Sequence, residues 1–556
     1  MQTATTETGE TGRDAPDRDW WRGAVIYQIY PRSFQDSDGD GIGDLRGILT
    51  RLPHIAELGA NAVWISPFFT SPMLDYGYDV SDYRDVDPLF GTLGDFDAVV
   101  AEAHRLGLKV MIDLVLSHTS DQHPWFRESR SDRTNPRNDW YVWADPKPDG
   151  TVPNNWLSIF GGSAWHWDSR RQQYYLHNFL AEQPDLNFHN PQVQDALLDV
   201  AGFWLDRGVD GFRLDTINFY FHSEGLEDNP PLPIGQRDYS TAPAVNPYNY
   251  QDHVHDKSQP ENLAFLERFR ALLDHYPAAA AVGEVGDAQR GLEIVAAYTA
   301  EGKRIHMCYS FDFLGPEKLT GHRVRLVLET FGHVAADGWS CWAFSNHDVM
   351  RHATRWGWNE PDPLGYLKVT SALMMTLRGS ICLYQGEELG LPEAELTFEQ
   401  LRDPYGIRFW PEFKGRDGCR TPMVWDSHQP NAGFSPATPW LPVPAEHIML
   451  ARNTQIDDPH SLLSHYRRML AFRAAHPTLV KGDIRFIETH GDTVAYVRTR
   501  GNEQILCAFN LGHAPAEVHP EPGSAPCAMD APVIDAVLED GVIRLGPYGA
   551  WYGTLA

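Results

Sequence analysis

The sequence contains little cysteine and no long hydrophobic run. Six cysteines in 556 residues are too few for a disulfide scaffold, and the lack of a CxxC pair excludes a zinc ribbon or redox dithiol. No stretch approaches the roughly 18 apolar residues that a membrane-spanning helix needs. Cys308, Cys341 and Cys382 lie in apolar runs and are expected to be buried, reduced thiols. This cysteine usage favours a cytoplasmic protein.

Positive charge is also scarce. The 46 lysines and arginines are outnumbered by 75 aspartates and glutamates, giving a formal net charge of −29. Such a field repels nucleic acids and anionic membrane surfaces, so we expect neither as a partner. Residues 1–19 lack the apolar core of a secretory signal and are predicted to be a disordered tail. A neutral or cationic small molecule is the expected ligand.

Two phosphate-binding motifs are missing. No GxGxxG follows the first apolar run and no GxxxxGK[ST] occurs, which disfavours a doubly wound open sheet. Short, continuous apolar runs instead alternate with amphipathic segments, which is typical of buried parallel strands separated by helices. The predicted strands are 25–31, 62–66, 110–116, 211–215, 281–285, 307–313, 341–346 and 381–386. This alternation predicts an α/β fold with a (β/α)8 TIM barrel.

Three connections are too long for simple loops, and all follow the carboxyl ends of predicted strands, where barrels place active sites. Residues 119–189 are predicted to form a small inserted domain after the third strand, whereas 218–262 and 390–450 are expected to shape a pocket. From residue 483 the runs become short and alternating. The predicted domains are the barrel (20–118 and 190–482), the insert (119–189) and a C-terminal antiparallel β-sandwich (483–556).

Carboxylates stand at the ends of three predicted strands. Asp215 stands at the carboxyl end of the fourth strand, and Arg213 on the same side would keep it ionised, as a nucleophile requires. Glu284 ends the fifth strand without an adjacent cation in the sequence, so burial would raise its pKa and suit a general acid. Asp348 follows the seventh. Alone, each fits an ion pair, cap or turn; together they suit glycosidic chemistry, with the third stabilising an oxocarbenium-like transition state.

Four segments carry a family resemblance. DLVLSHTS, GFRLDTIN, GEV and SNHD, in this order and on these strands, resemble the sequence regions of the alpha-amylase family of retaining glycosidases, glycoside hydrolase family 13. QPDLNF at 183–188 is similar to the oligo-1,6-glucosidase and alpha-glucosidase branch. In the first segment, His118 is expected to donate to a sugar. Asp113 either orients the site from behind or is buried for structural reasons.

The resemblance implies roles for particular residues. Asp215 would be the nucleophile, Glu284 the general acid and base, and Asp348 the transition-state stabiliser. The implied substrate-binding residues are Asp75, Tyr78, His118, Phe179, Arg213, Thr216, His347 and Arg420. Asp75 and Arg420 together would hold the 4-hydroxyl side of the terminal glucose, which would make the enzyme exo-acting. Thr216, directly after the nucleophile, resembles enzymes that prefer α-1,4 links.

These features predict a retaining α-glucosidase that releases α-glucose from maltose and other short α-glucosides, and that also transfers glucose to alcohol acceptors. A monomer or a homodimer is expected. Sucrose hydrolysis or isomerisation, or trehalose conversion, is the alternative within the same mechanism. An inactive binding module is disfavoured by the complete set of carboxylates. An unrelated metal-dependent barrel hydrolase is disfavoured because no HxH pair follows the first strand.

An acidic loop follows the first strand. DSDGDGIGD over 36–44 looks like the start of a calcium loop, with acidic residues at positions 1, 3, 5 and 9, but Gly47 replaces the bidentate glutamate of an EF-hand. Similar enzymes bind one divalent ion here, through residues that correspond to Asp36, Asp38, Asp40, the Ile42 carbonyl and Asp44. We expect one structural Ca²⁺ or Mg²⁺, with a solvated acidic turn as the alternative, and no organic cofactor.

Overall fold

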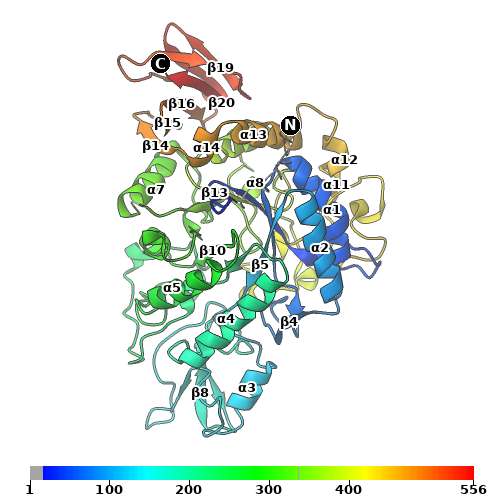
Figure 1. Ribbon diagram of the computed structural model, residues 1–556, viewed down its shortest axis with the longest axis vertical. Helices are drawn as coiled ribbons and strands as arrows, with labels where there is room; N and C mark the ends of the chain where they lie inside the picture. Colours follow the sequence, from blue (N-terminus) through cyan, green and yellow to red (C-terminus); the bar gives the residue numbers. More distant parts are fainter. Residues whose placement is uncertain (1–16, 336, 358, 556) are drawn as a thin grey trace, which may run out of the picture.

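The computed structural model describes residues 17–335, 337–357 and 359–555, and its centre is an eight-stranded parallel sheet (Figure 1). Its strands, in chain order, are β1 (Val25–Ile29), β2 (Ala62–Ile65), β5 (Lys109–Leu114), β9 (Gly211–Leu214), β10 (Ala280–Val285), β11 (Met307–Ser310), β12 (Cys341–Ala343) and β13 (Ser380–Tyr384). The hydrogen-bonded order is β11-β10-β9-β5-β2-β1-β13-β12, and an isolated parallel bridge from Cys308 to Ser340 joins the two ends. The predicted TIM barrel is therefore confirmed.

A long helix follows each barrel strand in the chain. These helices are α1 (Leu45–Leu58), α2 (Leu93–Arg105), α4 (Pro191–Asp206), α5 (Asn262–Leu273), α6 (Gly291–Thr299), α7 (Gly321–Val334), α9 (Pro363–Met374) and α13 (Leu462–Ala475). The shorter helices are α3 (Pro124–Ser129), α8 (His352–Arg355), α10 (Pro404–Phe409), α11 (Ala445–Met449), α12 (Arg452–Gln455) and α14 (Pro477–Lys481). No helix in the described ranges is long and apolar enough to cross a bilayer.

Alternation along the strands separates two cores. Ile26, Trp64 and Met111 belong to a buried cluster inside the barrel, while their strand neighbours, such as Tyr27, pack in the large cluster that includes the helices. Trp21, from the turn before β1, joins the interior cluster. The predicted disordered tail over 1–19 falls mostly on residues 1–16, which lie outside the described residues.

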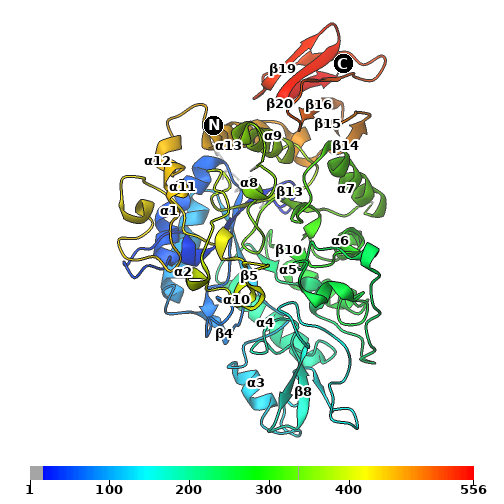
Figure 2. The same cartoon turned by 180° about the vertical axis from the view of Figure 1, so that it is seen from behind.

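The long connection after β5 contains its own small sheet. Strands β6 (Trp143–Ala144), β8 (Gln173–Leu176) and β7 (Trp165–Asp168) pair antiparallel in that order, next to α3. A further pair, β3 (Phe69–Thr70) with β4 (Asp82–Val86), lies between β2 and α2. Figures 1 and 2 both place α3 and β8 at the end of the molecule away from the C-terminal sheet.

The C-terminal segment forms an antiparallel sheet, as predicted. Its strands are β14 (Asp483–Ile487), β15 (Thr493–Arg500), β16 (Glu503–Asn510), β17 (Ala516–Val518), β18 (Pro526–Ala528), β19 (Ile534–Glu539) and β20 (Val542–Leu555). They belong to one hydrogen-bonded sheet, because β20 pairs with β16, β17, β18 and β19. The predicted domain bounds at 119, 190 and 483 stay predictions.

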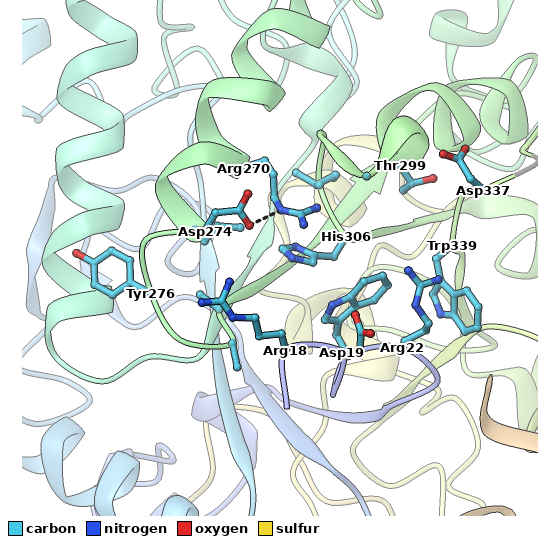
Figure 3. Close-up of a pocket in the computed structure, with 16 residues that line it drawn as sticks. Arg18, Asp19, Arg22, Arg270, Asp274, Tyr276, Thr299, His306, Asp337 and Trp339 are labelled. Atoms are coloured by element: carbon cyan, nitrogen blue, oxygen red, sulfur yellow. Dashed lines mark hydrogen bonds and ion pairs between the residues drawn. The ribbon is translucent and has the colours of Figure 1, made fainter. Parts of the chain in front are cut away.

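A small cavity lies at the amino-terminal end of the barrel. It has a volume of about 170 Å³ and is lined by Arg22, Arg270 and His306, among others (Figure 3). Its walls come from the turn before β1 and from the segments before β10, β11 and β12. None of its described lining residues is a predicted site residue, so this cavity is not the predicted active site.

Candidate active site

A larger cavity, of about 680 Å³, lies at the carboxyl ends of the barrel strands. The three predicted catalytic carboxylates, Asp215, Glu284 and Asp348, all line it. Five of the predicted substrate-binding residues line it as well: Asp75, Tyr78, His118, Phe179 and Thr216. Segments 239–244 and 411–416 complete its walls, as expected for the two long loops that contain them. The structure therefore gathers residues that are far apart in the chain around one space.

The Arg213 guanidinium connects the two carboxylates predicted to do the chemistry. Its side chain is completely buried, and Nη1 donates to Asp215 Oδ1 at 2.5 Å and to Asp113 Oδ1 at 2.8 Å. Nη2 donates to Glu284 Oε2 at 2.5 Å. Nη2 and Nε also donate to the Tyr309 hydroxyl, at 3.0 and 3.2 Å. One cation thus binds three carboxylates through charge-assisted hydrogen bonds, which are among the strongest in proteins.

Burial dominates the protonation of Asp215 and Glu284. It raises the pKa of Asp215 and of Glu284 to about 7, although Arg213 acts in the opposite direction on both. The prediction that Arg213 would simply keep Asp215 ionised was incomplete, because burial and the nearby Asp113 and Asp348 charges oppose it. Glu284 does have a cation beside it, which comes from the neighbouring strand. Burial therefore moves the pKa of both carboxyl groups toward neutral pH.

The chain turns sharply immediately after Asp215. Thr216 has φ 41° and ψ 49°, a left-handed conformation that costs a β-branched residue about 1–3 kcal/mol. This turn aims the Thr216 backbone N–H at Glu284 Oε2, at 3.1 Å, and places its hydroxyl 3.2 Å from Asp215 Oδ2. Thr216 therefore donates a hydrogen bond to each of the two carboxylates. These bonds depend on the left-handed backbone, which explains why a strained conformation is found at this position.

Asp113 and His347 lie behind the cavity wall. Asp113 is fully buried; besides Arg213 it accepts from the Tyr78 hydroxyl at 3.0 Å and from Trp64 Nε1 at 3.1 Å. It thus orients two site residues, which agrees with the first of its two predicted roles. His347 Nε2 lies 2.5 Å from the Tyr78 hydroxyl, and Nδ1 lies 2.7 Å from Gln28 Nε2. Arg213, His347 and Arg420 are absent from the described lining of the cavity.

Asp348 occupies a much more cationic environment. Its Oδ1 accepts from Arg420 Nη2 at 2.8 Å and from Arg416 Nη1 at 3.2 Å, and its Oδ2 lies 3.1 Å from His347 Nε2. Burial opposes its ionisation, but the cations beside it hold its pKa well below the usual range. Because burial also lowers the pKa of His347, we take its ring as neutral and assign the effect to the arginines.

Asp75 pairs with Arg416, while the expectation that Asp75 and Arg420 together hold the sugar stays a prediction. Arg416 Nη2 donates to Asp75 Oδ1 at 2.7 Å, and the same guanidinium binds the buried Asp403 through Nη2 and Nε, at 2.8 and 3.1 Å. Arg420 instead donates from Nε to the His347 carbonyl at 2.7 Å. Both arginines stand in the segment FKGRDGCR, four residues apart, so the sequence offered no signal to choose between them.

The insert contributes two residues that lie beside Asp75 and His118. The Phe179 ring lies 5.2 Å from the His118 ring, and burial lowers the pKa of His118 to about 4, so this imidazole is neutral at pH 7. Gln183, the first residue of QPDLNF, donates from Nε2 to Asp75 Oδ2 at 3.1 Å. Sequence reasoning missed Gln183, although it had singled out the segment that contains it.

The acidic loop after β1 gathers three of its predicted ligands. Ligand atoms of Asp36, Asp38 and Asp40 lie within 4.8 Å of one another. In the described part of the chain, no lysine, arginine or histidine forms a salt bridge with these three. Asp44 is not in this group; it accepts from the Ser37 backbone and hydroxyl, and it caps the start of α1 by accepting from Gly47 N.

This arrangement defines a class of protein. The barrel holds three buried carboxylates around one cavity. One arginine bridges two of them, and two further arginines keep the third ionised. These are the parts of a glycoside hydrolase. The chain belongs to the alpha-amylase family: the profile described as "Alpha amylase, catalytic domain" matches residues 28–482. It is thus a glycoside hydrolase of the branch that resembles alpha-glucosidases and oligo-1,6-glucosidases, as predicted.

Similar proteins cover nearly the whole chain. It is 64% identical to a "probable alpha-glucosidase" of Rhizobium meliloti, over 97% of this chain and 98% of that protein. It is 36% identical to an oligo-1,6-glucosidase of Heyndrickxia coagulans, over 89% and 92% of the two chains. The crystal structure of an alpha-glucosyl transfer enzyme, XgtA, superposes with a TM-score of 0.94 at 54% identity, over 98% and 100%.

Removing the Arg416 guanidinium should destabilise the fold in a pH-dependent way. We expect Arg416→Met to lower the free energy of unfolding by about 3–5 kcal/mol at neutral pH, because Asp75 and Asp403 lose their buried partner. Both carboxyl groups would then have a higher pKa in the folded chain than in the unfolded chain. The destabilisation therefore grows as the pH rises above about 4, and thermal unfolding at pH 5 and pH 8 measures it.

The exposed Arg402 of the same loop provides the control. Arg402→Met should change stability little at either pH. An Arg416→Met variant whose melting temperature falls by the same amount at both pH values would contradict the proposed electrostatic role.

Proposed function

We propose that the protein is a retaining, exo-acting α-glucosidase that releases α-glucose from the nonreducing end of short α-glucosides. The observation that carries this proposal is the Arg213 bridge, which holds Asp215 and Glu284 on one guanidinium. Such a bridge favours the short separation of about 5–5.5 Å that retaining enzymes use, because an inverting enzyme needs room for a water between its carboxyl groups. The similarity to a probable alpha-glucosidase supports it.

In the first step, an Asp215 oxygen attacks the anomeric carbon as the glycosidic bond breaks. Glu284 gives its proton to the departing oxygen, which leaves as an alcohol, and a covalent β-glucosyl ester forms on Asp215. The pKa values near 7 suit this step, since one proton on Glu284 and a charge on Asp215 can coexist. Asp348, held ionised by Arg416 and Arg420, stabilises the positive charge that develops on the sugar ring.

In the second step, Glu284 acts as base. It removes a proton from water, the water oxygen attacks the anomeric carbon, and the ester bond to Asp215 breaks. Two inversions at one carbon return the α configuration. An alcohol in place of water would give an α-glucoside by the same route. Apolar residues such as Phe311, Leu314 and Val349 line the cavity and favour such acceptors, and the similarity to an alpha-glucosyl transfer enzyme supports this activity.

The exo preference rests on Asp75 and Arg416. Both are nearly buried and paired where they line the cavity, so a sugar bound against them would have no space for a further unit. Arg416 is proposed here in addition to Arg420, whose expected contact with the sugar stays a prediction. Thr216 beside Asp215 supports the α-1,4 preference, because its side chain would face the departing group.

Maltose hydrolysis followed by NMR tests the proposal. We expect α-glucose as the first anomer, formed faster from maltose than from isomaltose, and loss of this reaction in Asp215→Asn. Parallel assays with sucrose and trehalose separate the alternative donors. Turnover of sucrose alone would contradict the α-1,4 assignment, β-glucose as first product would contradict the retaining mechanism, and inactivity on every donor would leave a binding module.

We further propose that Asp36, Asp38 and Asp40 hold one structural divalent cation, Ca²⁺ or Mg²⁺, with the Ile42 carbonyl. Three neighbouring carboxylates without a cationic side chain fit such an ion, since their mutual repulsion needs a counter-charge. Asp36 also accepts from Ser435, so the ion would fasten the loop after β1 to the loop after β13. Asp44 would join only after leaving its place at the start of α1.

Chelation tests the cation. EDTA should lower the melting temperature, and added Ca²⁺ or Mg²⁺ should restore it, while kcat of the folded enzyme stays unchanged because the ion takes no part in the chemistry. Asp40→Asn should weaken this response. A melting temperature that ignores both chelator and cation, in a protein shown by elemental analysis to be metal-free, would identify a solvated turn.

The remaining expectations stay proposals of the same kind. A cytoplasmic location is supported by six free cysteines, five of them buried. Partners would be small sugars such as maltose, and alcohol acceptors, with no nucleic acid or membrane. We propose a monomer or a homodimer.

A further inference from the structure

Tyr309 is an uncharged hydrogen-bond partner of Arg213 and is not among the described residues that line the cavity. It stands on β11, paired in register with Glu284 on β10, and its side chain is buried among the interior residues of the barrel. The Trp64 ring packs against it, with ring centroids 6.3 Å apart. Its hydroxyl is therefore fixed by the barrel itself and is out of reach of the sugar.

The hydroxyl oxygen accepts two of the five Arg213 N–H groups. The two Nη1 protons are donated to Asp113 and Asp215, and one Nη2 proton is donated to Glu284. The second Nη2 proton and the Nε proton both point to Tyr309, at 3.0 and 3.2 Å. Together these acceptors satisfy every donor of the planar guanidinium, and a single bond is left for Glu284.

We propose that Tyr309 is a positioning residue for catalysis, which sets how strongly Arg213 binds Glu284 by occupying the two remaining guanidinium donors. This inference rests on the function proposed above and deepens it. A neutral oxygen at this place satisfies the donors without adding a fourth negative charge to the cluster. Without it, two buried N–H groups would lack an acceptor, which is costly.

The consequence falls on the proton of Glu284. If the oxygen is removed, the guanidinium turns toward the adjacent Glu284 carboxylate and binds it more strongly. The ionised form of Glu284 is then favoured, and its pKa falls from about 7. A smaller fraction of the enzyme then carries the proton on Glu284 at pH 7. The rate falls most for substrates whose leaving group must be protonated as the bond breaks.

Tyr309→Phe removes only the oxygen and keeps the ring. We expect the basic limb of the kcat/KM profile to move to lower pH by roughly half a unit to one unit. At pH 8 this shift predicts about a threefold to tenfold loss of kcat/KM with maltose, whose leaving group needs a proton, and less than about a twofold loss with 4-nitrophenyl α-glucoside, whose leaving group does not.

Tyr496→Phe is the matched control. It also removes the hydroxyl of a buried tyrosine, which contacts Thr376 Oγ1 at 2.7 Å near the C-terminal sheet, so it can cost stability without moving the pH profile. An unmoved basic limb in folded Tyr309→Phe, or an equal loss with both substrates, would overturn the inference. If the wild type fails to cleave either glucoside, the proposed function itself is wrong.

Discussion

A single buried cation, the guanidinium of Arg213, is the interaction on which the rest of this site depends. Three carboxylates from neighbouring barrel strands would repel one another in a dry interior, and burying any of them alone would cost several kcal/mol. The guanidinium binds all three, and the Tyr309 hydroxyl accepts its two remaining donors. The parallel strands β5, β9, β10 and β11 bring these groups together at one level of the barrel.

A second cationic centre gives the cavity its asymmetry. Arg416 and Arg420 converge on Asp348 and hold it ionised, whereas the pair bridged by Arg213 titrates near pH 7. One half of the site can therefore exchange a proton while the other keeps a fixed negative charge. Catalysis through a positively charged sugar needs both properties at once, and the structure supplies them from separate sets of arginines.

The barrel, and the convergence of three carboxylates at the carboxyl ends of its strands, were predictable from the sequence because local pattern determines them. Continuous apolar runs located every barrel strand, and Asp215, Glu284 and Asp348 were identified by standing at strand ends. Partner choice was not predictable in the same way. Arg416 and Arg420 lie in one irregular loop, and only its folded path shows that the first reaches Asp75. The Arg213–Glu284 hydrogen bond likewise joins different strands. The residues next to Glu284 in the sequence therefore could not show that a cation lies beside it.

Trapping the covalent intermediate would show which carboxylate attacks the sugar. A fluorinated α-glucosyl donor that slows the second step should leave one glucosyl group on the enzyme, and peptide mass spectrometry locates it. The proposed mechanism requires the label on Asp215, with faster trapping in the wild type than in Glu284→Gln for a donor with a poor leaving group. A label on Glu284 or Asp348, or turnover to β-glucose without any label, would contradict it.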